Sequence, residues 1–231
     1  PALLVTPLAP PAAPPKPAAV PAAAAKVTPD AQIGRCLELR RSRPREALEL
    51  ADAVLADQRL DVERRIKALS CQGIAAGLVG DQPRAVAIAD RITVELDRNP
   101  QLPDPYRMRA LSNLGAILHG AGQIYRAENV YARTLEIGAR IGGPDAVRIQ
   151  ASTLNNIGMV HADYLDSPQV ADGYFQQALA LSRSVGDSDA QLLYNYAVNR
   201  VRLGERVPAL AGLPQAAMAA EQAGNQLVGL R

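Results

Sequence analysis

The sequence places a small residue at regular intervals inside segments that otherwise read as apolar helices. Gly73, Gly115, Gly158 and Ala197 follow one another with a period of roughly 40 residues, which is typical of a chain built from stacked structural repeats. A glycine inside a helix costs about 1 kcal/mol relative to alanine. Its recurrence at one position of the repeat therefore indicates a packing requirement.

Each small site stands within the same apolar pattern. A leucine precedes it by four positions, and an alanine twelve or thirteen positions after it begins a second stripe with offsets of four and three. Such offsets place side chains on one face of a helix. Three sites are followed seven positions later by a glycine, at Gly80, Gly122 and Gly204, where a left-handed residue would end the first helix. The predicted unit is therefore a helix, a turn and a second helix, and the predicted fold is all-α.

One copy of this pattern resembles the signature of the tetratricopeptide repeat family, at Leu111, Leu114, Gly115, Leu118, Gly122, Ala127, Tyr131 and Leu135. The resemblance covers about residues 31–220 in five copies, of which the first has a degenerate first helix. It implies a right-handed superhelical solenoid of antiparallel helix pairs, in which the small residues let paired helices approach closely. The period is longer than is usual for the family, as it is in kinesin light chains and in bacterial peptide-sensing receptors.

Residues 1–29 differ in composition from the rest of the chain. They hold half of the prolines and show no helical periodicity, so we expect residues 1–29 to be a disordered Pro/Ala-rich segment. We expect the repeat domain over residues 30–231. Because the chain lacks an initiator methionine and its last residues read as the opening of a further helix, we also expect it to be part of a longer protein.

The resemblance implies that the first helix of each pair lines a concave surface, where a ligand would bind. Two positions before three of the small sites stand Asn113, Asn156 and Asn195. An asparagine amide can pair with the C=O and N–H of any extended peptide backbone, so these residues form a candidate peptide-binding ladder. The alternative is that these asparagines tolerate a wet helix face or bond a neighbouring helix. Further candidates for the same surface are Lys67, Arg109, Ser112, Asn155, Tyr194 and Arg202, with Asp163 beside them.

Catalytic and metal chemistry is not expected. His119 and His161 belong to successive repeats, sit at different offsets from their small sites, and have no carboxylate cluster at ligand spacing. Cys36 and Cys71 are the two cysteines, and we favour two buried thiols over a disulfide bridge between them. We expect no enzyme activity, no cofactor and no metal.

The charge and composition limit which classes of partner are expected. A formal net charge of +2 without a long basic run argues against nucleic acid, and the sequence has no apolar run long enough for a membrane span. Arginine far outnumbers lysine, which favours a bacterial source.

These observations predict a protein- or peptide-binding module. We expect it to be the sensory or scaffolding region of a larger bacterial signalling or envelope protein. The alternative is an assembly module that docks a globular partner or forms a homodimer. The Pro/Ala-rich start slightly favours a periplasmic over a cytoplasmic location.

Overall fold

The computed structural model describes residues 28–205, and within this range it contains nine helices and no strand. In chain order they are α1 (Pro29–Leu39), α2 (Pro44–Leu55), α3 (Val62–Leu78), α4 (Gln82–Arg98), α5 (Asp104–Gly120), α6 (Ile124–Ile141), α7 (Gly143–Asp163), α8 (Pro168–Ser184) and α9 (Ala190–Arg202). The expected Pro/Ala-rich segment, apart from its last two residues, and the expected second helix of the last repeat lie outside the described residues. Helix α1 begins at Pro29, one residue before the expected start of the repeat domain.

Short-range signals in the sequence set where the helices begin and end. The side chains of Thr28, Asp61 and Asp189 accept hydrogen bonds from backbone N–H groups at the starts of α1, α3 and α9. Gly80 and Gly122 have positive φ angles of 83° and 71° just beyond the ends of α3 and α5. These angles, and the 84° of Gly204 after α9, confirm the predicted helix-terminating glycines.

The α7–α8 turn carries one residue more than the α3–α4 and α5–α6 turns. Here Asp166 takes a left-handed conformation, with a φ of 45°, and it is the one described residue other than glycine that does so. Aspartate tolerates this region better than most residues because its short polar side chain can bond locally. The extra residue therefore stays in the turn and leaves the helix pairing unchanged.

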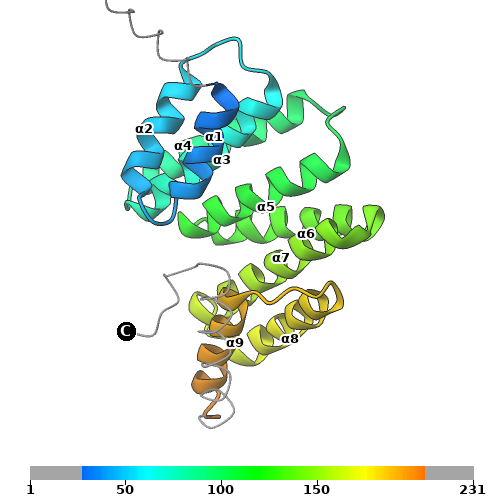
Figure 1. The fold of residues 1–231 in the computed structure, drawn as a ribbon. Coiled ribbons are helices and arrows are strands. Elements are labelled where there is room, and N and C mark those ends of the chain that lie inside the picture. The colour runs from blue at the N-terminus through cyan, green and yellow to red at the C-terminus, as the bar shows by residue number, and fades with distance from the viewer. Residues whose placement is uncertain (1–27, 206–231) are drawn as a thin grey trace, which may run out of the picture.

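The helices stack in pairs along the chain, from α1 and α2 to α9 (Figure 1). Each helix packs against the next, and in addition the odd-numbered helices pack against one another: α1 on α3, α3 on α5, α5 on α7 and α7 on α9. Among the described helices, no even-numbered helix packs on another even-numbered helix. The even-numbered helices are therefore splayed apart on the outer side of a solenoid, while the odd-numbered helices line its inner side.

The recurring small residues lie where paired helices touch. A Cβ atom added at Gly115 on α5 would lie 2.6 Å from Cδ1 of Tyr131 on α6. One added at Gly158 on α7 would lie 2.8 Å from the Phe175 ring on α8. Real Cβ atoms are not found this close to ring carbons, so both sites exclude any larger residue in this packing. This confirms that the glycines serve close helix approach.

The two cysteines form a disulfide bond between α1 and α3, with their Cα atoms 6.2 Å apart. Both residues are buried. The expectation of two separate thiols is therefore wrong. The sequence reasoning failed because the long separation of Cys36 and Cys71 along the chain gives no indication that α1 folds back onto α3. Over residues 28–205, no helix is both long and apolar enough to cross a bilayer.

Candidate peptide-binding groove

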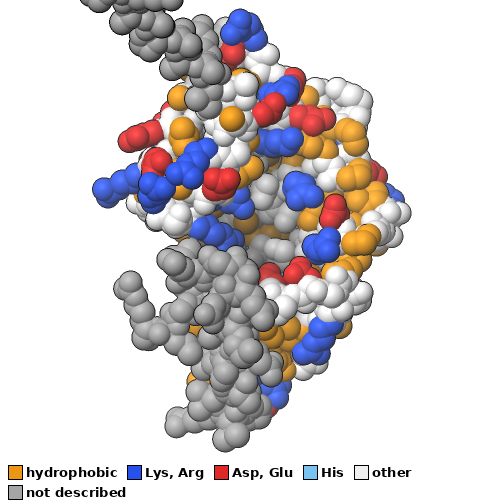
Figure 2. Space-filling view, in the orientation of Figure 1, with side chains coloured by type: hydrophobic (Ala, Val, Ile, Leu, Met, Phe, Trp, Pro, Cys, Tyr) orange, Lys and Arg blue, Asp and Glu red, His pale blue; other side chains and the backbone are white. Residues whose placement is uncertain are grey.

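The inner side of the solenoid presents one partly exposed stripe from each odd-numbered helix. Lys67 on α3 and Arg109 on α5 are exposed, and Ser112 and Asn113 on α5 are half-buried. The Nζ of Lys67 lies 5.8 Å from the centroid of the Tyr106 ring, which holds this cation beside the start of α5. On the face shown in Figure 2, cationic and anionic side chains are interspersed, and the cationic ones are most numerous at the left, over α1 and α2.

Asn113 and Asn156 occupy equivalent places on α5 and α7, and both are half-buried. Among the described residues, the Asn113 side chain forms no hydrogen bond. The side-chain amide of Asn156 lies near the buried hydroxyl of Tyr131. The two groups do not meet the geometric criteria for a hydrogen bond. Burial raises the pKa of Tyr131, and the Asn156 amide acts in the opposite direction. Asn113 is therefore open to a ligand, whereas Asn156 also contacts the helix pair before it.

Asn195, the third asparagine of the expected ladder, lies in the contact between α7 and α9. It is buried, and its Nδ2 donates to Oδ1 of Asn155 at 3.0 Å and to the sulfur of Met159 at 3.1 Å. Its Oδ1 accepts from Gln191 at 3.0 Å. Both donors of the amide are thus used within the protein. The structure differs here from the expectation that all three amides, with Asn155, face a ligand.

The remaining expected site residues lie at the far end of the same stripe. Tyr194 on α9 is 39% exposed. Arg202 donates to the backbone oxygen of Ala162 at 2.9 Å and to Asp163 at 2.6 Å, so it ties α9 to the end of α7. Arg202 and Asp163 neutralise each other, whereas Lys67 and Arg109 form no ion pair within residues 28–205, although the charge of Lys67 acts on the Asp30 carboxylate.

At the opposite end, the disulfide replaces the asparagine. Cys71 occupies on α3 the place that Asn113 and Asn156 occupy on α5 and α7, and its sulfur is bonded to Cys36 of α1. Helix α1 therefore covers this position. The position two residues before each small site is therefore a disulfide cysteine on α3, a partly exposed asparagine on α5 and on α7, and a buried asparagine on α9.

An apolar strip beside the amides was missed by the sequence reasoning. The residue directly after each small site is apolar and half-buried: Ile74, Ala116, Met159 and Val198. In an odd-numbered helix this residue lies three positions after the asparagine and so on the same face. The apolar residue after each small site is visible in the sequence, but the predicted site consisted of polar and charged side chains with one tyrosine. Together the amides and this strip form what we call the inner groove.

The histidines are held by aromatic neighbours. The ring of His119 meets that of Tyr164 edge-on at 5.4 Å, and the ring of His161 stacks on that of Tyr174 at 5.2 Å. Burial lowers the pKa of His119, partly opposed by the charge of Asp163. Within residues 28–205, no group of three or more potential metal ligands comes together.

Comparison with known families identifies part of the chain directly. The family model described as tetratricopeptide repeat matches residues 106–184, which run from α5 to the end of α8. Residues 106–184 thus match the tetratricopeptide repeat pattern. A comparison with curated protein sequences gave no significant match.

Solved structures show that the tetratricopeptide arrangement extends beyond this segment. BtubC (BKLC) from P. vanneervenii is similar, with a TM-score of 0.60 and 20% identity over 86% of this chain and 82% of that chain. The Rap protein complexed with Competence and Sporulation Factor gives a TM-score of 0.70 at 14% identity, over 87% of this chain but only 55% of that chain. A thermophilic tetratricopeptide repeat protein of Thermus thermophilus gives a TM-score of 0.55 at 22% identity, over 87% of this chain and 94% of that chain. These likenesses confirm the all-α, tetratricopeptide-like solenoid.

Proposed function

We propose that this chain is a protein-interaction module that holds an extended peptide along the inner groove. The observation that carries the proposal is the pairing of Asn113 and Asn156 with the apolar strip on the same helices. The amides offer a donor and an acceptor at successive repeats, and their chemistry suits a peptide backbone of any sequence. The strip offers apolar contact to the side chains that point toward it.

Two further features support the proposal. The Rap protein was solved with Competence and Sporulation Factor bound, so a solenoid of similar fold can hold a second molecule. In addition, Lys67 and Arg109 stand exposed at one end of the groove. We expect these cations to favour a peptide whose corresponding end is neutral or acidic.

The wider setting is also a proposal. We infer that the module belongs to a bacterial signalling or envelope protein, as its sensory or scaffolding region. Buried disulfides are typical of oxidising compartments, so the bond between Cys36 and Cys71 favours a periplasmic or otherwise extracytoplasmic location.

The proposal is tested by peptide binding. A library of random extended peptides is screened against the wild-type chain, and the affinity of the best peptides is compared in the double variant Asn113→Ala, Asn156→Ala. Loss of the hydrogen bonds should cost roughly 1–3 kcal/mol of binding free energy. The matched control is Asn129→Ala, an exposed asparagine on α6 on the outer side of the solenoid, which should bind as the wild type does.

Two results would count against the groove. Equal binding by the double variant and the control would show that the amides do not contact the peptide. Absence of binding by the wild type, together with a molecular mass that rises with concentration, would favour the assembly module instead.

A further inference from the structure

Positive charge is concentrated in the turn between α1 and α2 together with the first three residues of α2, a stretch that we call the charged turn. Residues 40–46 contain the arginines Arg40, Arg41, Arg43 and Arg45 against one carboxylate, Glu46. Four arginines and one glutamate give this turn a formal charge of +3, whereas the whole chain carries +2. The rest of the molecule is therefore nearly balanced, and the excess charge lies in one turn.

Little of this charge is compensated inside the protein. Arg43 pairs with Glu46 at 3.0 Å. Arg41 and Arg45 are exposed, and within residues 28–205 neither lies within ion-pair distance of a carboxylate. Arg40 is half-buried and donates to the backbone oxygen of Leu37 at 3.0 Å, while its buried Nε has no partner among the described residues. Burial lowers the pKa of Arg40, and the neighbouring Arg41 lowers it further. An anion brought to this turn would relieve that repulsion.

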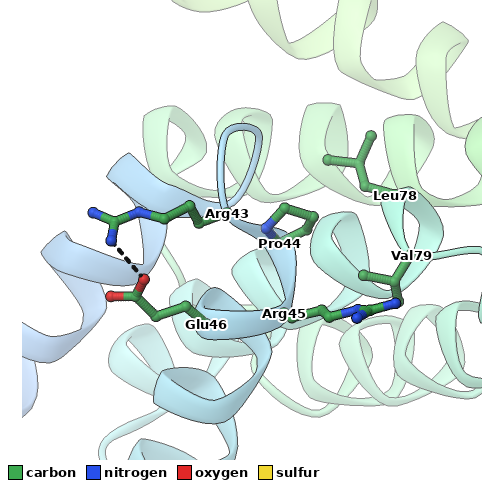
Figure 3. A pocket seen from close by; sticks show the side chains of 6 residues that line it. All are labelled: Arg43, Pro44, Arg45, Glu46, Leu78 and Val79. Atoms are coloured by element: carbon green, nitrogen blue, oxygen red, sulfur yellow. Dashed lines mark ion pairs between the residues drawn. The ribbon is translucent and has the colours of Figure 1, made fainter.

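A pocket of about 540 Å³ lies beside the charged turn. It is lined by Arg43, Pro44, Arg45, Glu46, Leu78 and Val79 (Figure 3). Leu78 and Val79 are adjacent at the end of α3 and are 54% and 37% exposed, so they give this pocket an apolar surface that a partner can cover. Figure 3 shows the Arg45 side chain extending toward Val79, while Arg43 turns aside to Glu46. The pocket thus combines an apolar wall with a cationic rim.

We propose that this pocket is a second docking site, for an acidic segment of a partner protein that carries an aliphatic side chain next to its carboxylates. The aliphatic side chain packs between Pro44 and Leu78. The carboxylates pair with Arg41 and Arg45. Because neither arginine forms an ion pair within the described chain, no existing ion pair has to break.

The apolar wall decides between an acidic peptide and other polyanions. A phosphate backbone would satisfy the arginines but would leave Leu78 and Val79 facing water. A peptide that alternates acidic and aliphatic residues covers both. The site uses none of the inner-groove residues, so it adds a contact to the proposed peptide binding and does not depend on it.

The test measures fluorescence anisotropy of a labelled peptide of alternating aspartate and leucine with the full chain. Reversal of two charges, in Arg41→Glu with Arg45→Glu, should weaken binding by about tenfold or more, because both contacts become repulsive. The control variant, Arg91→Glu with Arg133→Glu, changes the net charge equally at two exposed arginines on α4 and α6 and should change affinity by about twofold at most. Leu78→Ser should weaken binding several-fold without touching a charge.

Three outcomes would overturn the proposal. The first is an equal loss in both charge-reversal variants, which would indicate general attraction. The second is binding of heparin or polyphosphate as strong as that of the peptide, with no effect of Leu78→Ser on the peptide. The third is no binding of the peptide by the wild type. The double variant Asn113→Ala, Asn156→Ala should bind this peptide normally, which separates this site from the inner groove.

Discussion

At the level of single residues, the packing of the helix pairs depends on glycines, which have no side chain. Gly115 and Gly158 give up about 1 kcal/mol each of helix propensity. In return the rings of Tyr131 and Phe175, both almost fully buried, lie directly against the backbone of the partner helix. Close packing of an aromatic ring on a helix backbone gains more contact than one methyl group would provide. The cost of each glycine is therefore offset by the ring that it admits.

This balance between helix propensity and ring packing predicts that a glycine-to-alanine substitution has opposite effects at two positions. Gly115→Ala should lower the free energy of unfolding by about 1–3 kcal/mol, because the buried Tyr131 ring has no room to move away. Gly173→Ala, within α8, should raise it by up to about 1 kcal/mol, since a Cβ there meets nothing within 4 Å. Urea unfolding of both variants measures the difference. A stabilising Gly115→Ala would disprove the packing argument.

At the scale of the element, α1 is distinguished by its covalent attachment to α3. It has 11 residues, and the pair that it forms with α2 packs only against α3 within the described chain. Terminal repeats of a solenoid lack one neighbour and are the first to open. The disulfide between Cys36 and Cys71 fixes α1 in place at this weak end, and it also closes the first position of the inner groove.

Removal of this bond should loosen the first helix pair. The double variant Cys36→Ala, Cys71→Ala should lose about 2–4 kcal/mol of unfolding free energy, as expected for a bridged loop of this size. Hydrogen exchange should rise most in α1 and α2. A reducing agent should reproduce the effect in the wild type and leave the double variant unchanged. Two reactive thiols in the denatured, unreduced wild-type protein would contradict the presence of the bridge.

At the scale of the whole molecule, the solenoid has two main apolar cores in succession. The larger runs from α1 to α7, and a second cluster of Leu154, Ala171, Phe175, Ala178, Leu179 and Leu192 joins α7, α8 and α9. Leu135 and Tyr174 pack against both. Because each helix contacts only near neighbours, the two cores are coupled mainly through α7 and the residues that pack against both, and we expect stability to be local.

Local stability predicts local unfolding. Phe175→Ala should cost about 3–5 kcal/mol within the second cluster and accelerate hydrogen exchange in α8 and α9, while α3 and α4 keep their protection. The reciprocal control, Leu69→Ala in the larger core, should loosen α3 and α4 first. Uniform acceleration along the chain in both variants would show a single cooperative unit instead.

The repeat and the close contact within each helix pair could be predicted from the sequence alone. The spacing of Gly73, Gly115 and Gly158 predicted the helix pairs, and Gly80 and Gly122 predicted where first helices end, because both signals act over a few residues of one helix. Which side chains remain available to a ligand depends instead on contacts between helices. The tertiary structure placed Asn195 in the α7–α9 contact and brought Cys36 to Cys71, since both outcomes depend on how helices distant along the chain are tilted and placed against each other. Helical periodicity gives the face on which a residue lies, but the neighbouring helix determines whether that face is open.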